Sequence, residues 1–148
     1  MADDTDVLLK MYEEAWEQAR QSESQRATVT NIILVIASAI LAFIAEIGLS
    51  LKTIPLTLLL VIFGVYGAFI TLKLYSIFRR HIWQLRLWRK KIDELHPNAQ
   101  ILLIKNEADK EYKKEYPNLD KLPLHVLWLI LYLVIALIGV SLTLLVLI

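Results

Sequence analysis

Three long apolar segments constrain what this chain can fold into. They lie at residues 28–51, 54–72 and 124–148 of the 148-residue sequence. Each is close to the ~20 residues that an α-helix needs to cross ~30 Å of hydrocarbon. The sequence therefore predicts an all-α integral membrane protein with three transmembrane helices.

The charged residues are concentrated outside these segments. Residues 1–27 hold three basic and seven acidic side chains, and residues 73–123 hold twelve basic and seven acidic ones. Lys and Arg near a span set its orientation, so we expect 73–123 to lie in the cytoplasm. The N-terminus is then cytoplasmic too, residues 48–53 form an outer hairpin, and Ile148 lies near the outer surface.

The N-terminal segment, 1–27, has the pattern of an amphipathic helix. Its half-apolar line recurs at helical spacing through Leu8, Tyr12, Ala15, Ala19, Ser22 and Arg26. No Pro or Gly intervenes before Gly48, so this cytoplasmic helix is expected to continue into the first span, 28–51.

The second span is expected to continue far beyond the membrane. A heptad seam follows it, with apolar residues and one histidine at alternating steps of four and three. This predicted oligomer seam consists of Leu74, Phe78, His81, Leu85, Trp88, Ile92 and Leu95. A helix over 54–95 is roughly 60 Å long, about twice the hydrocarbon thickness. Pro97 then ends it, and 96–123 form a cytoplasmic helical connector to the third span.

A basic surface with interleaved aromatic residues lies on the cytoplasmic part of that helix. Its members are Arg79, Arg80, Arg86, Arg89, Lys90 and Lys91. Such a segment is typically attracted to anionic lipids. An acidic cytoplasmic protein or a nucleic acid, acting as a trigger, is the alternative partner.

Small and polar residues in the spans suggest two further features. Asn31, Ser38 and Glu46 form a sparse polar line, which an oligomer could gather around an axis as a pore lining. The alternative is that Glu46 reaches the outer interface and Asn31 marks the inner one. Ala42 and Ala45 on the first span, and Gly64 and Gly67 on the second, permit close helix contact, either between copies or within one chain.

Residues for enzyme chemistry are few. The chain has no cysteine and no glycine-rich phosphate loop, and its histidines at 81, 96 and 125 lack metal-ligand spacing. Arg89 and His96 have the Arg-x6-His spacing of HEPN ribonucleases, in its loosest form. We expect no enzyme, and no catalytic residue, metal or cofactor; a HEPN-like ribonuclease is kept as an alternative.

Several landmarks together resemble a known family. They are Tyr12, Trp16, Gln18 and Arg20 before Asn31, then the segments GVYGAF and LKLYSIFRRH and the motif LHP at 95–97. This pattern, over roughly residues 8–97, resembles the RipA-like octameric family of small bacterial membrane proteins. The membrane proteins that accompany some CRISPR RNases are similar, as are, more distantly, two-helix effectors of antiphage defence.

The resemblance implies a homo-oligomer of the bacterial inner membrane with a central pore or cavity, and in its defence-linked members a membrane-perturbing role during phage infection. Together with the polar line, it predicts a homo-oligomer that forms or controls a permeation pathway such as an ion channel. The alternative is a non-conducting membrane scaffold that recruits cytoplasmic partners.

Overall fold

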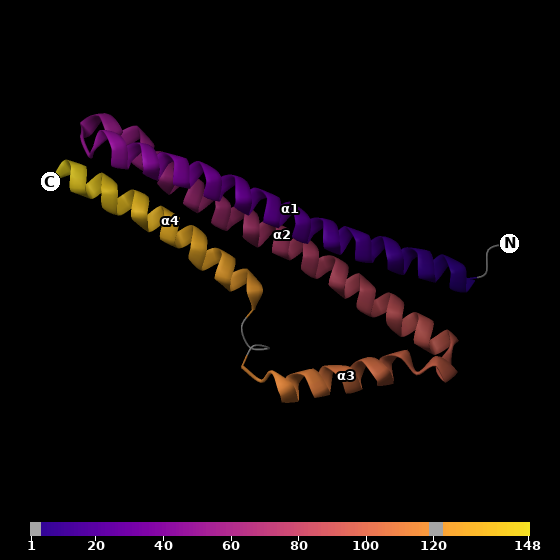
Figure 1. Cartoon of the computed structure of the whole chain (residues 1–148). Coiled ribbons are helices and arrows are strands. Elements are labelled where there is room, and N and C mark those ends of the chain that lie inside the picture. Colours follow the sequence, from indigo (N-terminus) through magenta and orange to yellow (C-terminus); the bar gives the residue numbers. More distant parts are fainter. Residues whose placement is uncertain (1–3, 119–122) are drawn as a thin grey trace. The chain divides into compact units, whose positions relative to one another are not determined.

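The computed structural model describes residues 4–118 and 123–148, and within them the chain is helical. Four long helices follow one another, with a short 3₁₀ turn on each side of the second (Figure 1). Their bounds are α1 Asp4–Ile47, η1 Leu51–Thr53, α2 Ile54–Leu95, η2 Pro97–Ala99, α3 Ile101–Glu115 and α4 Leu124–Leu147. The described residues contain no strand, and the all-α prediction is confirmed.

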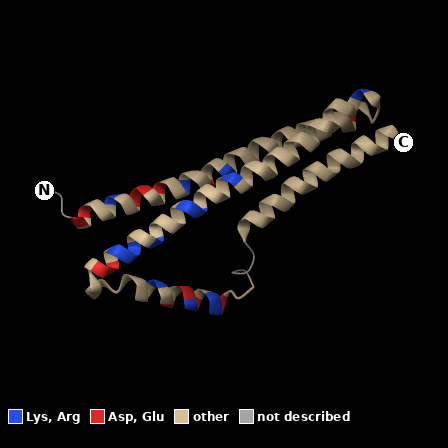
Figure 2. Ribbon diagram, turned by 180° about the vertical axis from the view of Figure 1, so that it is seen from behind, with Lys and Arg blue, Asp and Glu red and all other residues tan. Residues whose placement is uncertain are grey.

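The chain divides into two compact units. The charged unit comprises Met1–Glu23 and Tyr75–Pro123, and the apolar unit comprises Ser24–Leu74 and Leu124–Ile148. Figure 2 shows the contrast between the helices of the two units, with acidic side chains toward the start of α1 and basic ones on the later part of α2. The only charged residues of the apolar unit are Arg26, Glu46, Lys52 and Lys73.

α1 is one continuous helix of 44 residues, as the absence of Pro and Gly predicts. It ends at Ile47 because Gly48 takes a φ of 77°, where only glycine avoids a steric penalty. The Gly48 N–H closes the last turn by donating to the Ile44 carbonyl at 3.0 Å. A tight turn follows, in which the Thr53 hydroxyl accepts from the Ser50 N–H and donates to the Ser50 carbonyl.

α2 covers the same range that the sequence predicts for the long second helix, Ile54–Leu95. Pro55 stands in its first turn, where a missing N–H costs no helix hydrogen bond. The helix runs through Tyr75–Arg80 without a break. Beyond α2, Gln100 has a φ of 50° and α3 begins at Ile101. The apolar residues 101–104 therefore form the first turn of α3, whose remaining residues are mostly charged.

Three helical stretches of the described chain are long and apolar enough to cross a membrane. They are Asp4–Ile47, Leu51–Leu95 and Leu124–Leu147. Each contains all or most of one of the three apolar segments, which confirms the prediction of three candidate membrane-spanning helices. The first span ends at Ile47 rather than at residue 51, because the chain turns at Gly48.

The core of the apolar unit lies among α1, α2 and α4, and on each of the first two helices its buried positions form a seam that recurs at steps of four and three. On α1 these are Arg26, Thr30, Ile33, Ala37, Ile40 and Ile44, and from η1 into α2 they are Thr53, Thr57, Leu60, Gly64, Gly67 and Thr71. Glycines and threonines occupy much of the α2 seam, which lets neighbouring helices approach closely.

α4 packs onto α2 through glycines. A Cβ at Gly64 would lie 2.6 Å from the Ala136 nitrogen, and one at Gly139 would lie 2.8 Å from the Thr57 carbonyl oxygen. A Cβ at Gly67 would overlap the Tyr132 ring, whose residue is fully buried. Gly64 and Gly67 thus serve contact within one chain, the second of the two alternatives that the sequence left open.

Two hydroxyl pairs also join the helices of the apolar unit. Thr30 on α1 and Tyr132 on α4 share a hydrogen bond of 2.7 Å, and Thr143 on α4 donates to Thr57 on α2 at 2.7 Å. Hydrogen bonds between membrane helices contribute on average about 0.6 kcal/mol each. They therefore add to the glycine packing without replacing it.

In the charged unit, the first part of α1 lies along the last part of α2 (Figure 1). Ala15, Ala19 and Ser22 of the predicted amphipathic line are buried, and Leu8 and Tyr12 are half-buried. On α2, Leu85 and Ile92 are the buried partners. The small alanines allow the bulkier α2 residues to pack close to the α1 backbone.

The glycine contact at Gly67 gives a direct test of this packing. Gly67→Ala should destabilise the protein by about 1–3 kcal/mol, because the added methyl displaces a buried ring. Thermal unfolding in mild detergent measures the change. The control is Ala39→Val at an exposed position of α1, which adds more volume than Gly67→Ala does. It should leave the melting temperature within a degree or so of the original. Equal losses of stability in the two variants would contradict the close contact between Gly67 and Tyr132.

Candidate functional site

The three predicted pore-lining residues are all exposed within one chain. Asn31, Ser38 and Glu46 lie on the outer side of α1, away from its buried seam. Ala42 and Ala45 are exposed on the same side, and with Asn31 and Ser38 they form what we call the small-residue face. Val35, which is 69% exposed, lies between Asn31 and Ser38 on this face and is its one larger apolar side chain. The eight-residue step from Ser38 turns Glu46 about 80° around the helix from that line.

The other exposed surfaces of the apolar unit are bulky and apolar. On α1, Ile32 and Phe43 are about half exposed. On α2, a shallow groove of about 460 Å³ is lined by Val61, Ile62, Val65, Tyr66 and Phe69. Large aliphatic and aromatic side chains suit contact with lipid tails, whereas an amide such as that of Asn31 does not.

The burial of polar groups in the apolar unit was not predicted from the sequence. The Arg26 guanidinium carbon lies 5.8 Å from the centre of the Trp128 ring, and Arg26 is only 5% exposed. Thr30, one turn further, bonds Tyr132. The signal in the sequence was that these polar residues fall on the buried seam of α1. Polar residues at core positions of a span require partners from neighbouring helices.

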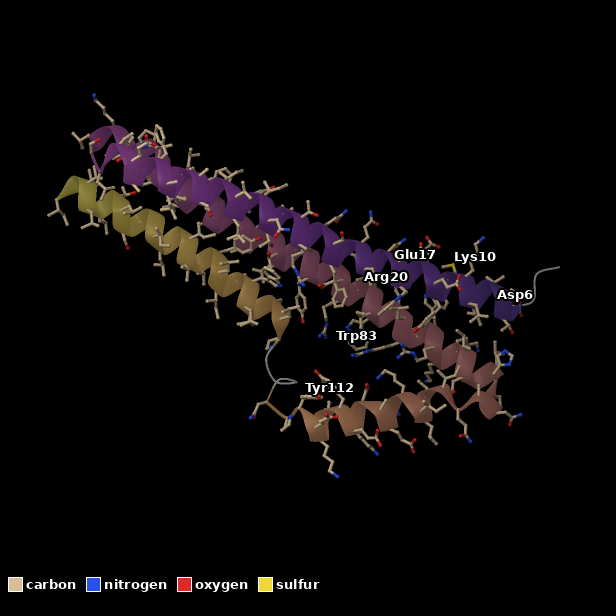
Figure 3. The ribbon with its side chains drawn as sticks, viewed as in Figure 1. Asp6, Lys10, Glu17, Arg20, Trp83 and Tyr112 are labelled. Carbon is tan, nitrogen blue, oxygen red and sulfur yellow. The ribbon has the colours of Figure 1, made fainter. Side chains whose placement is uncertain are left out.

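The predicted basic surface is mostly exposed. Arg79, Arg80, Arg86, Lys90 and Lys91 are open to the surroundings, while Arg89 is half-buried. Arg86 lies 5.3 Å from the Trp83 ring centre, and Arg79 lies 6.0 Å from that of Tyr75. Figure 3 shows Trp83 on the side of α2 away from α1, and Lys10 and Glu17 on the outer side of α1. The interleaved aromatic residues therefore hold arginines by cation–π contact.

The predicted oligomer seam is partly used within the chain. Leu85 and Ile92 are 2% and 7% exposed, and of the other five members four are half-buried and Leu95 is exposed. Contact of this seam with sister copies remains a prediction. The residues available for it are the half-buried ones and Leu95.

Hydrogen bonds tie the start of α1 to the end of α2. Arg89 Nη2 donates to the Tyr12 hydroxyl at 2.9 Å, and its guanidinium carbon is 5.7 Å from the Tyr12 ring centre. The Thr5 hydroxyl and His96 Nε2 lie 3.2 Å apart. Arg89 and His96, the two residues of the ribonuclease alternative, thus each contact a different hydroxyl of α1.

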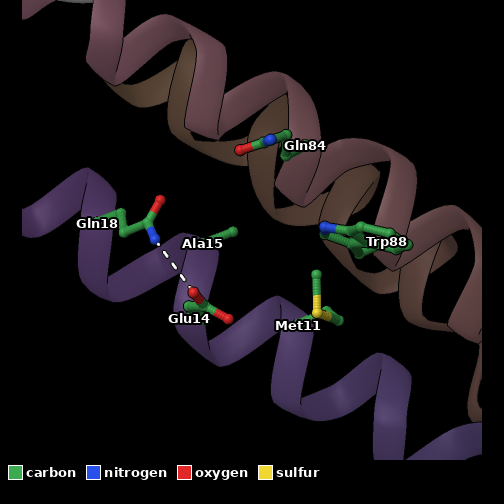
Figure 4. A pocket seen from close by; sticks show the side chains of 6 residues that line it. All are labelled: Met11, Glu14, Ala15, Gln18, Gln84 and Trp88. Atoms are coloured by element: carbon green, nitrogen blue, oxygen red, sulfur yellow. Dashed lines mark hydrogen bonds between the residues drawn. The ribbon is translucent and has the colours of Figure 1, made fainter.

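A small pocket opens between α1 and α2 in the charged unit. It has a volume of about 180 Å³ and is lined by Met11, Glu14, Ala15, Gln18, Gln84 and Trp88. In Figure 4, Gln18 bonds Glu14 at 3.3 Å along α1, and Met11 faces the Trp88 ring. The pocket holds no cluster of titratable groups suited to catalysis, and nowhere in residues 4–118 and 123–148 do three metal-ligand side chains gather.

The bond between Arg89 and Tyr12 should contribute measurably to the charged unit. Tyr12→Phe keeps the ring but removes the acceptor, so we expect a loss of about 1 kcal/mol. Faster amide hydrogen exchange over residues 4–23 is the measurement. Tyr112→Phe, on the exposed face of α3, is the control and should change nothing there; unchanged exchange in Tyr12→Phe would show that the bond has no stabilising role.

The profile of the octameric membrane protein family (8xMP) matches residues 9–148, which include most of both units. No curated protein and no solved structure matches the chain. The family agrees with the three apolar helices and confirms the predicted homo-oligomeric membrane protein at that level. This chain belongs to the octameric membrane protein family.

Proposed function

We propose that the chain is the subunit of a homo-oligomeric permeation pathway in a bacterial inner membrane, with the charged unit in the cytoplasm. The observation that carries the proposal is the contrast between the exposed faces of the apolar unit. One of them combines an amide, a hydroxyl and two alanines with a single valine, and the others are bulky and apolar. Antiphage defence is the proposed setting. This part of the proposal rests on the resemblance to the RipA-like octameric family, to which membrane proteins that accompany some CRISPR RNases are similar.

Symmetry supports this arrangement. Copies inserted in one orientation are related only by rotation about the membrane normal, so an octamer of this family would form a ring. Each copy then turns one face toward the axis. An Asn facing lipid tails is costly, because its amide has no hydrogen-bond partner there. The small-residue face, with Asn31 and Ser38, is therefore the face proposed to line the axis.

Small side chains also leave room at the axis. Ser38, Ala42 and Ala45 project little from α1, whereas Ile62 or Phe69 at the same place would close a path by packing and dewetting. The orientation follows from the charge asymmetry, since twelve basic residues lie between the second and third spans. The proposed role is non-enzymatic.

A scaffold that recruits cytoplasmic partners is the second candidate. It is favoured by the five exposed basic side chains of α2, of which Lys91 pairs with Glu94 at 3.4 Å. An assembled oligomer that conducts nothing, but loses an in vivo cross-linked partner on charge reversal at Arg79, Arg80 and Lys90, would support this function instead.

Because the chain has no cysteine, a single introduced thiol reports directly on the axis. Ser38→Cys should react with a charged, membrane-impermeant thiol reagent about tenfold faster or more than Ile62→Cys, since a thiolate forms only where water enters. Ile62 is exposed on α2 and is proposed to face lipid. Equal, slow labelling of both variants in the assembled oligomer would exclude a wet axis at Ser38.

Glu46 should determine which ions pass. A ring of carboxylates at one mouth favours cations, so Glu46→Gln should shift the reversal potential of reconstituted protein toward non-selectivity under a KCl gradient. Lys52→Gln, a charge change in the neighbouring outer turn, is the control and should not reduce cation preference. An unchanged reversal potential in Glu46→Gln, or no flux from correctly assembled oligomer, would count against the pathway.

A further inference from the structure

A small basic pocket lies between α2 and α3 in the charged unit. Its volume is about 230 Å³, and it is lined by Arg86, Arg89, Leu102, Lys105 and Asn106. The permeation pathway makes no use of it. Lys105 and Asn106 also lie outside the basic surface that the sequence predicts.

Helical spacing explains why these residues meet. Arg86 and Arg89 are three apart on α2, and Leu102 stands three and four residues before Lys105 and Asn106 on α3, so each helix presents one side. Asp93, one turn beyond Arg89, accepts a hydrogen bond of 3.3 Å from the Leu102 N–H. This bond anchors the first turn of α3 at the edge of α2.

Both guanidinium groups are held before any ligand arrives. Arg89 uses one of its five N–H donors on the Tyr12 hydroxyl, which leaves the others for a ligand. Arg86 lies over the Trp83 ring at 5.3 Å. Preorganised guanidinium forks bind anions at a smaller entropic cost than free ones.

The charge around the pocket is unbalanced. Three cations line it, and two acids lie beside them. Asp93 accepts from the Leu102 N–H, and Asp109 accepts a hydrogen bond from Lys105. That bond lowers the pKa of the Asp109 carboxyl, with Lys105, Lys113 and Arg89 adding electrostatic attraction. Asp109 is therefore charged at neutral pH. Three cations and the two carboxylates of Asp93 and Asp109 leave a local net charge of +1 (three less two).

Size and charge together point to the ligand class. Pockets for whole drug-sized molecules measure about 300–1,000 Å³, so 230 Å³ suits a single charged group better than a nucleotide. Guanidinium forks match phosphate and carboxylate oxygens, but the three cationic side chains at one pocket can pair with more oxygens than the two that a carboxylate offers. We propose that the pocket bounded by Arg86, Arg89 and Lys105 binds a phosphate group, carried either by a free phosphate compound or by a phospholipid headgroup.

The first test uses inorganic pyrophosphate as the probe, titrated calorimetrically into the full-length oligomer in uncharged detergent at constant ionic strength. Arg86→Gln and Lys105→Gln should each weaken binding about tenfold or more, the effect of one lost charge-assisted hydrogen bond. The matched controls Arg80→Gln and Lys114→Gln remove the same charge from the same helices outside the pocket. They should change the affinity by about twofold or less. Equal losses in pocket and control variants would overturn the proposal.

A gain-of-binding variant guards against simple misfolding. Asp109→Asn frees Lys105 and removes one of the two negative charges beside the pocket, so pyrophosphate should bind about two- to fivefold more tightly. Unchanged or weaker binding would contradict the site.

The lipid arm uses native mass spectrometry of the oligomer with phosphatidylglycerol or phosphatidylcholine. Selective retention of phosphatidylglycerol that Arg86→Gln abolishes and Arg80→Gln does not would identify the headgroup as the source. Pyrophosphate binding without such retention would identify a free phosphate compound. Neither binding would overturn the proposal, and because neither arm measures conductance, its failure is distinct from that of the permeation pathway.

Discussion

The structure depends on close packing among the three helices of the apolar unit, which must associate where no water drives them together. Lipid tails are as apolar as leucine, so the hydrophobic effect does not hold membrane helices together. In the apolar unit, Gly64, Gly67 and Gly139 let backbones approach, and Tyr132 fills the space above Gly67 while bonding Thr30. These contacts decide which surfaces are consumed inside one subunit and which are left for the oligomer.

The surfaces left over differ in kind, and this difference connects packing with function. Because the α2 seam is used against α1 and α4, its small residues are unavailable to sister copies. The small-residue face of α1 is the exposed one that combines an amide, a hydroxyl and alanines. This difference is the basis for proposing that the small-residue face lies on a shared axis, with Ile62 and Phe69 toward lipid or neighbours.

The charged unit uses a different chemistry. Its arginines are immobilised one at a time, Arg89 by Tyr12 and Arg86 by Trp83, and the same side chains line a basic pocket with α3. An arginine that stabilises the contact between helices thus also supplies donors for an anion. This dual use links the stability of the unit to its proposed phosphate chemistry.

The sequence by itself determined the helices, because apolar length, glycine and proline act locally: α1 runs unbroken to Gly48, α2 continues from Ile54 to Leu95, and the line through Ala15, Ala19 and Ser22 is buried. Only the tertiary structure decided which contacts form. That Gly67 meets Tyr132, that Leu85 and Ile92 are buried within one chain, and that Lys105 joins Arg86 depend on residues far apart in sequence. A helical pattern fixes the face on which a residue lies, but it does not specify which distant helix covers that face.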